Sequence, residues 1–210
     1  MTKPSRDEVF AEARDLVRRE SATVGAIADL VGNEAFTRVI DLLLATTGKV
    51  ITAGSGTSGT VARRTAHLLS VCGTPALYLN PTDGLHGSLG AVAAGDVVIA
   101  FSKGGGTGEL TEFASRAQQR GAKAIAVTCR EESALVELAD ITVLIPAGDS
   151  DPGNAMAMGS TFAMSSWTDA LSISLMSLRG YTWEEFLFTH PGGRVGEETE
   201  QILTGLTHRE

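Results

Sequence analysis

The segment KVITAGSGTSG at residues 49–59 decides the fold class, because it joins a short apolar run to a turn of glycines and hydroxyl side chains. The turn leads directly into a helical pattern that contains Val61, Ala62 and Leu69. A buried strand that enters a helix through such a turn is the repeating unit of α/β proteins. We therefore expect more units of this kind along the chain.

Four more short apolar runs follow, and helical patterns separate most of them. Together with the first run, the expected strands cover residues 49–53, 76–79, 97–101, 124–127 and 141–145. Apolar strands that alternate with helices form parallel sheets covered on both faces. The sequence therefore predicts an α/β fold with a five-stranded parallel sheet between two layers of helices.

Helical patterns also flank the predicted sheet. Apolar residues at helical spacing from Asp7 to about Thr47 predict two or three helices before the first strand. A stretch rich in small residues at 157–178 predicts a long helix, and its start at Gly159-Ser160-Thr161 could hold an anion. A capping box at Thr182-Trp183-Glu184-Glu185 predicts a last helix. We expect one domain over 1–210, with a helical segment at about 5–47, a core at about 48–178 and a C-terminal helix and tail at 179–210.

Composition limits the classes of partner and location. The chain has 17 basic and 25 acidic residues, a net charge of -8, and no basic cluster. This argues against nucleic acid, whose binding depends on clustered cations. The first residues lack an apolar signal core, and no run approaches the roughly 18 apolar residues of a membrane span. A cytoplasmic protein is expected, and an anionic ligand would have to be held by backbone N–H groups at helix starts.

The cysteines and histidines give no sign of a metal site. Cys72 and Cys129 are far apart and lie in or beside apolar segments, which is typical of buried free thiols. Neither a C-x-x-C nor an H-x-x-x-H spacing occurs in the sequence. No metal and no cofactor are predicted.

A second turn of glycines and hydroxyl side chains, SKGGGTG at residues 102–108, follows the third predicted strand. Two such turns on neighbouring strands converge where open α/β sheets bind ligands. Together they form the outline of a phosphate site, with candidate binding residues Ser55, Thr57, Ser58, Ser102, Lys103 and Thr107. A purely structural interpretation makes the second turn a flexible connection and Lys103 a solvated charge.

A dinucleotide site is the other ligand class to weigh, since residues 54–59 also fit the G-x-G-x-x-G pattern. The second predicted strand, however, ends in Tyr78-Leu79-Asn80-Pro81, without an acid to hold a ribose. A nucleotide is therefore disfavoured.

Four stretches resemble the sugar isomerase (SIS) domains, and among them the arabinose-5-phosphate isomerase-like group: residues 54–59, 80–90, 102–107 and 190–193. The resemblance implies a flavodoxin-like three-layer sandwich and a small phosphorylated sugar as partner. It implies that Ser58, Ser102, Lys103 and Thr107 surround the phosphate, that Ser160 and Thr161 lie nearby, and that His86 and His190 face the sugar. It also implies a homotetramer in which helices such as the one ending at His190 complete a neighbour's site.

The chain departs from that group at charged positions. Thr57 replaces a lysine of the first turn, and Gly104 and Gly106 replace a serine and a glutamate of the second. A later glutamate of the group aligns approximately with Asp149, which is thus a further candidate for substrate binding. Many relatives also carry CBS modules after this region, and we expect none here, since the sequence runs to Glu210 without their pattern. The resemblance therefore does not fix the substrate.

Two histidines are the predicted proton carriers. Aldose-ketose isomerisation through an enediol needs a base near C1 and C2 and a group that moves protons at the oxygens. Histidine suits both roles near neutral pH, so His190 and His86 are the candidate catalytic residues, with Asp83 and Asp149 as possible partners. Structural roles remain open, with His86 supporting a turn and His190 at a helix C-terminus.

The predicted function is therefore a phosphosugar aldose-ketose isomerase. A non-catalytic phosphosugar-binding module is the main alternative, because of the lost charges. A different reaction of a sugar phosphate on the same scaffold is a weaker one.

Overall fold

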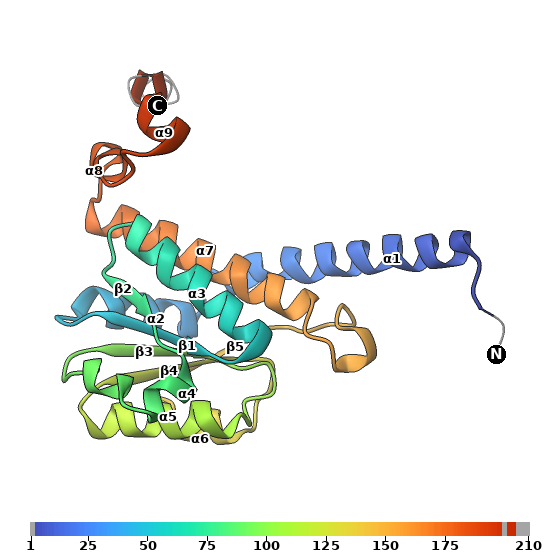
Figure 1. The fold of residues 1–210 in the computed structure, drawn as a ribbon, viewed down its shortest axis with the longest axis horizontal. Helices are drawn as coiled ribbons and strands as arrows, with labels where there is room; N and C mark the ends of the chain where they lie inside the picture. Colours follow the sequence, from blue (N-terminus) through green and yellow to red (C-terminus); the bar gives the residue numbers. More distant parts are fainter. Residues whose placement is uncertain (1–2, 199–200, 205–210) are drawn as a thin grey trace.

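The structure is a computed structural model that describes residues 3–198 and 201–204, and its centre is a parallel sheet in the order β2-β1-β3-β4-β5 (Figure 1). The strands are β1 (Val50–Gly54), β2 (Ala76–Tyr78), β3 (Val97–Phe101), β4 (Lys123–Thr128) and β5 (Ile141–Leu144). The predicted α/β fold with five parallel strands is confirmed. β1 and β3 are neighbours in the sheet, with β2 added on one side of this pair and β4 and β5 on the other. The two turns quoted above, which follow β1 and β3, therefore lie side by side.

Helices cover both faces of the sheet, as the sequence predicts (Figure 1). Successive residues of β3 point to opposite sides: Val97, Ile99 and Phe101 belong to one apolar core, Val98 and Ala100 to the other. The first core includes residues of α2 (Glu34–Ala45), α3 (Gly56–Val71) and α7 (Gly159–Arg179). The second includes residues of α5 (Gly108–Gln119) and α6 (Ala134–Leu138). The remaining helices are α1 (Arg6–Gly25), η1 (Ala26–Leu30), α4 (Pro81–Leu85), η2 (Ser88–Ala91), η3 (Pro152–Asn154), α8 (Trp183–Phe188) and α9 (Gly193–Glu197).

Trp167 lies at the centre of the first core. It is fully buried on α7, and its indole meets the ring of Phe36 edge to face with centroids 5.9 Å apart. Met164 and Leu171 lie one helical turn before and after it and are also fully buried. One face of α7 thus carries much of the apolar area that fixes this helix to the sheet.

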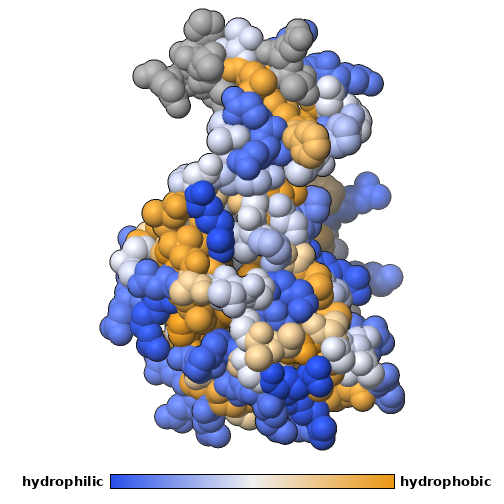
Figure 2. All heavy atoms as spheres, turned by 90° about the vertical axis from the view of Figure 1, so that its left-hand side faces the viewer, coloured by the Kyte–Doolittle hydropathy of each residue, from blue (hydrophilic) through white to orange (hydrophobic). Residues whose placement is uncertain are grey.

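Both ends of the chain carry exposed apolar side chains. The amino-terminal half of α1 projects beyond the body, with Val9 and Phe10 exposed (Figure 1). At the other end, α8 begins with the predicted capping box of Thr182 and Glu185. Phe188 on α8 is 86% exposed. Figure 2 shows hydrophobic side chains at the surface of the upper part of the molecule, which α8 and α9 form. In the described part of the chain, no helix is both long enough and apolar enough to span a membrane.

Two aspartates tie the strands together at the amino edge of the sheet, where the strands begin. Asp96 precedes β3 and accepts hydrogen bonds from the N–H groups of Lys49 (2.9 Å) and Ala93 (2.8 Å) and from Lys49 Nζ (2.7 Å). Asp140 precedes β5 and accepts from Ala124 N–H and Lys123 Nζ, both at 2.8 Å. Burial alone would raise the pKa of Asp96, but the hydrogen bonds from Lys49 and Ala93 outweigh it and lower the pKa.

Asp96→Asn is expected to lower the free energy of unfolding by about 1.5–3 kcal/mol at about pH 7, the usual contribution of hydrogen bonds to a charged group. Because the folded state depresses the pKa of this carboxyl group, its contribution is complete above about pH 4. It is lost as the pH falls through the folded-state pKa. Urea unfolding at a series of pH values should therefore show the two proteins converge in acid.

Asp15→Asn is the matched control, because Asp15 is an exposed carboxylate on α1 whose ion pair with Arg19 lies at the surface. Its effect should stay below about 1 kcal/mol at every pH. A gap between Asp96→Asn and the unchanged protein that is constant from neutral pH to acid would contradict the prediction.

Candidate functional site

The first predicted turn lies between β1 and α3 and requires its glycines. A Cβ on Gly54 would lie 2.8 Å from the carbonyl oxygen of Ser58, and one on Gly59 would lie 2.7 Å from that of Gly54. The close approach of strand and helix therefore excludes larger residues. Ser55 and Ser58 are half-buried and Thr57 is exposed. Ser55 occupies the N-cap of α3, yet its side chain makes no capping hydrogen bond.

The second predicted turn lies beside the first, because Gly54 pairs in register with Phe101. Ser102 is buried, its Oγ accepts the N–H of Gly105 at 3.0 Å, and it lies 3.3 Å from Thr107 Oγ1. Thr107 is the N-cap of α5, and its side chain also makes no capping hydrogen bond. Two helices that follow neighbouring strands, α3 and α5, thus begin with hydroxyl residues that do not cap them.

An ion pair joins the second turn to the start of α7. Lys103 Nζ lies 2.8 Å from Asp151 Oδ2 and donates to the carbonyl oxygen of Asn154 at 2.9 Å. Asp151 Oδ1 accepts the N–H groups of Met158 (2.7 Å) and Ser160 (3.1 Å). The pair therefore brings Ser160, with Thr161 beside it, close to the second turn.

Asp151 is a site residue that the sequence analysis missed. Its side chain is only 1% exposed. Burial would raise its pKa, but the hydrogen bonds from Lys103 and from the N–H groups of Ser160 and Met158 outweigh burial and lower the pKa. A carboxylate ahead of a helix suggests an N-cap. An N-cap residue directly precedes its helix, whereas several residues separate Asp151 from the start of α7, so no such signal appears in the sequence.

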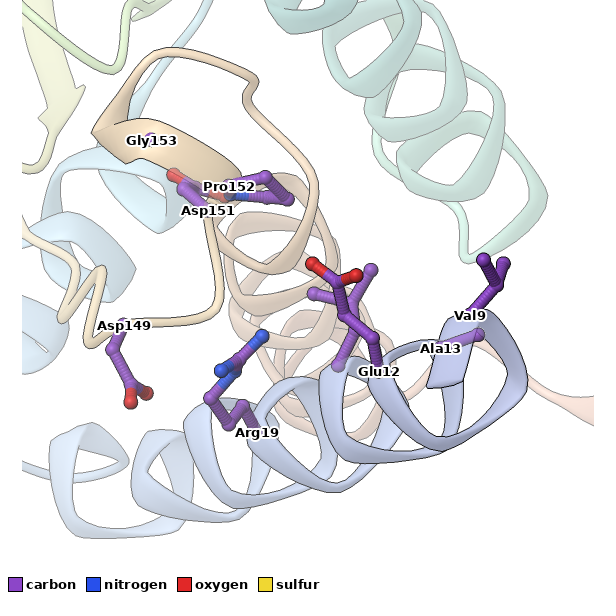
Figure 3. Close-up of a pocket in the computed structure, with 9 residues that line it drawn as sticks. Val9, Glu12, Ala13, Arg19, Asp149, Asp151, Pro152 and Gly153 are labelled. Atoms are coloured by element: carbon purple, nitrogen blue, oxygen red, sulfur yellow. The ribbon is translucent and has the colours of Figure 1, made fainter. Parts of the chain in front are cut away.

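Asp149 lines a hollow of about 440 Å³ between α1 and the loop before α7, and Asp151 lines the same hollow. Figure 3 shows Glu12 and Arg19 rising from α1 toward the loop that carries Asp149 and Asp151. Asp149 is exposed, whereas Asp151 is buried. The role of Asp149 in substrate binding stays a prediction.

His190, one of the two candidate catalytic histidines, is not brought to the turns within its own chain. α7 runs from the edge where the strands end to the opposite side of the molecule, where α8 and α9 lie (Figure 1). His190 follows α8 there, with Nδ1 2.8 Å from the carbonyl oxygen of Phe186 and its ring stacked on that residue. His86 is the exposed C-cap of α4. The catalytic role of both histidines stays a prediction, and His190 would need a second chain to reach the turns.

The cysteines are free, as predicted, but half-buried instead of fully buried. Burial, with the nearby charge of Asp151, raises the pKa of the Cys129 thiol to about 11. This thiol stays protonated at neutral pH and is a poor nucleophile. In the residues that the structure describes, no group of three or more His, Cys, Asp and Glu side chains could hold a metal ion.

Gly105→Ala is expected to disrupt the second turn. Gly105 has a φ of +65°, and a Cβ at this position would collide with Ser133 Oγ, which accepts a hydrogen bond from Val136 N–H at the start of α6. The left-handed backbone costs an alanine about 1 kcal/mol, and displacing the Ser133 cap costs about 1 more. Thermal unfolding should therefore begin several degrees lower in this variant. Gly104→Ala is the control, because a Cβ there meets nothing within 4 Å, and an equal loss in both variants would contradict the prediction.

Comparisons with known proteins agree on one family. The model of the SIS domain matches residues 43–174. Arabinose 5-phosphate isomerase KdsD of Pseudomonas aeruginosa is 33% identical over 201 residues, which are 92% of this chain and 62% of that protein. KdsD of Escherichia coli K12 is 34% identical over 84% of this chain and 54% of its own length. The chain thus spans less than two thirds of these curated relatives.

Two solved structures match nearly the whole chain. A Listeria monocytogenes protein described as a candidate sugar-phosphate isomerase is 31% identical, with a TM-score of 0.84. A protein of Escherichia coli CFT073 in complex with arabinose 5-phosphate is 28% identical, with a TM-score of 0.82. Each alignment covers 90% of this chain and 100% of the other.

Proposed function

The chain belongs to the SIS domain family, and on that premise we propose that it is a phosphosugar aldose-ketose isomerase of the arabinose-5-phosphate isomerase type. One observation carries the proposal. α3 and α5 begin side by side at the carboxyl ends of β1 and β3, and neither N-cap hydroxyl caps its own helix. Helix starts with free N–H groups attract anions.

In the proposed site, the phosphate of the sugar rests on the starts of α3 and α5. Ser55, Thr57 and Ser58 supply hydroxyl groups from the first turn, and Ser102 and Thr107 supply them from the second. Ser160 and Thr161 lie nearby at the start of α7. These groups bind the part of the ligand that all sugar phosphates share, so they give affinity without choosing the sugar.

The reaction itself needs proton transfer between neighbouring carbons. A base removes the proton on C2 of the aldose, an enediol forms, and a proton returns to C1 while the hydroxyl proton moves from O2 to O1. The turns contain no base: their only ionisable side chain, Lys103, is paired with Asp151. We assign proton transfer to His86 and to a second histidine, His190, which another subunit supplies.

A shared site is therefore part of the proposal. We propose a homotetramer in which helices from one subunit cover the turns of the next. The exposed apolar residues of α1 and α8, such as Phe10 and Phe188, support contacts between chains, since large apolar side chains on projecting helices are typical of interfaces. A cytoplasmic location without a nucleic-acid partner completes the proposal and agrees with the acidic composition.

A non-catalytic phosphosugar-binding module is the second candidate, and one observation favours it. Thr57 and Gly106 stand where the resembling group has ionisable side chains, so the turns hold fewer chemical groups. A module of this kind would bind the phosphate without moving protons.

One experiment separates the two candidates. The purified protein is mixed with pentose and hexose phosphates, both aldoses and ketoses, and conversion between them is followed together with thermal unfolding. Conversion of any member supports the isomerase. A rise in Tm without conversion supports the binding module. Neither conversion nor stabilisation by any member of the panel would overturn both.

A further inference from the structure

The Lys103–Asp151 ion pair is a device that positions the two halves of the proposed phosphate site, and we infer that both residues act through this pair and not on the ligand. The inference rests on the proposed function. It differs from what the family resemblance implies, which places Lys103 among the residues around the phosphate. The pair is called the 103–151 clamp below.

The lysine end of the clamp belongs to the second turn. The backbone of Lys103 is fixed by the end of β4, because its carbonyl oxygen accepts the N–H of Cys129 at 3.0 Å and the hydroxyl of Thr128 at 3.2 Å. Its side chain is 18% exposed and reaches two acceptors, Asp151 and Asn154, that both precede α7. The ammonium group is thus directed toward the loop before α7.

The aspartate end of the clamp belongs to α7. Both carboxylate oxygens have partners: Oδ1 accepts the N–H groups of Met158 and Ser160, and Oδ2 forms the ion pair with Lys103 Nζ. Asp151 therefore occupies the start of α7 as an anion would. In the described chain, α7 is capped by this carboxylate, whereas the N-cap side chains of α3 and α5 leave their helices uncapped.

The consequence is a division of roles among the three helix starts. The starts of α3 and α5 remain for the phosphate, and the start of α7 is held against the second turn by the clamp. Loss of either partner would leave the other charge buried and unpaired, which costs far more than the pair contributes. Ser102 and Thr107 would then lose their fixed position relative to Ser160 and Thr161.

The test uses Lys103→Met, Asp151→Asn and the double variant in the full chain, with a sugar phosphate that the unchanged protein converts. A clamp predicts that each single variant raises KM by about tenfold to a hundredfold, as expected for displaced binding groups. The double variant should be no worse than either single variant, because one shared contact is lost. Lys103→Arg should keep most of the affinity, since the guanidinium can still pair with Asp151.

Two outcomes would overturn the clamp. If Lys103 touches the phosphate directly, Lys103→Met will weaken binding far more than Asp151→Asn, which leaves the ammonium in place. If the pair has only a structural role, both variants will lower Tm and leave KM unchanged. Lys123→Met is the matched control, because its ion pair with Asp140 (2.8 Å) lies at the amino edge of the sheet and should not affect KM.

Amide hydrogen exchange of the ligand-free protein tests the clamp independently of the reaction. Either single variant should speed exchange both in residues 102–107 and in residues 151–161. Faster exchange in one of these segments alone would overturn the clamp even if the enzyme is active. If the unchanged protein converts and binds no sugar phosphate, the proposed function fails, while the exchange pattern still decides whether the pair couples the two segments.

Discussion

Replacing His190 with alanine is expected to lower kcat by about a hundredfold, the usual contribution of a general acid or base. The affinity for the phosphorylated ligand should change little, because the hydroxyl groups and helix starts proposed to hold the phosphate do not include His190. Steady-state kinetics should therefore show a fall in kcat without a matching rise in KM. His67→Ala is the matched control, since His67 is an exposed histidine of α3 with no proposed role.

Mixing two impaired variants, one without the proposed base and one without a proposed phosphate-binding hydroxyl, tests whether the site is shared between chains. His190→Ala subunits keep intact turns, and Ser102→Ala subunits keep an intact His190. After dissociation and reassembly, some sites of a mixed tetramer would combine good turns with a good histidine, so part of the activity should return. A mixture as inactive as its parents would place the site within one chain. An unchanged kcat in His190→Ala alone would remove His190 from the mechanism.

Replacing Trp167 with alanine should destabilise the chain more than any other change considered. The indole is fully buried, and the ring of Phe36 packs against it edge to face. Its removal loses both transfer free energy and packing around the resulting cavity, about 3–5 kcal/mol for a tryptophan. Urea unfolding should show a lower midpoint with little change in slope.

Trp183→Ala removes the same side chain from a different environment. Trp183 opens α8 and is 42% exposed, so the loss should stay near 1 kcal/mol or less in a single chain. Equal losses in the two tryptophan variants would contradict the assignment of Trp167 to the centre of the core. A much larger loss in Trp183→Ala at high protein concentration would instead place α8 in an interface.

The sheet and the two turns could be predicted because their signals are local. Each strand is a short, mainly apolar run, and each turn follows a strand directly. Every predicted strand boundary lies within one residue of the observed one. The glycines at 54, 59 and 105 are required by contacts that a Cβ would disturb. Local patterns of this kind need no knowledge of distant contacts.

The Lys103–Asp151 pair and the placement of the histidines could not be predicted, because they depend on contacts between distant segments. Asp149 and Asp151 are separated by one residue, and only packing against α7 decides which carboxylate is buried. Nothing in the sequence reveals that α7 carries His190 away from the turns. The assignment of residues 1–210 to a single domain also stays a prediction.

The paired aspartates at the amino edge of the sheet have a consequence for how this protein can diversify. Asp96 and Asp140 hold the strands by hydrogen bonds at the rim opposite the turns. At the other rim, Thr57 is exposed, and a Cβ on Gly104 or Gly106 would meet nothing within 4 Å. Those three positions can exchange residues while the scaffold stays folded. The strength of phosphate binding can therefore change by small steps at one rim of the sheet, with the other rim unaltered.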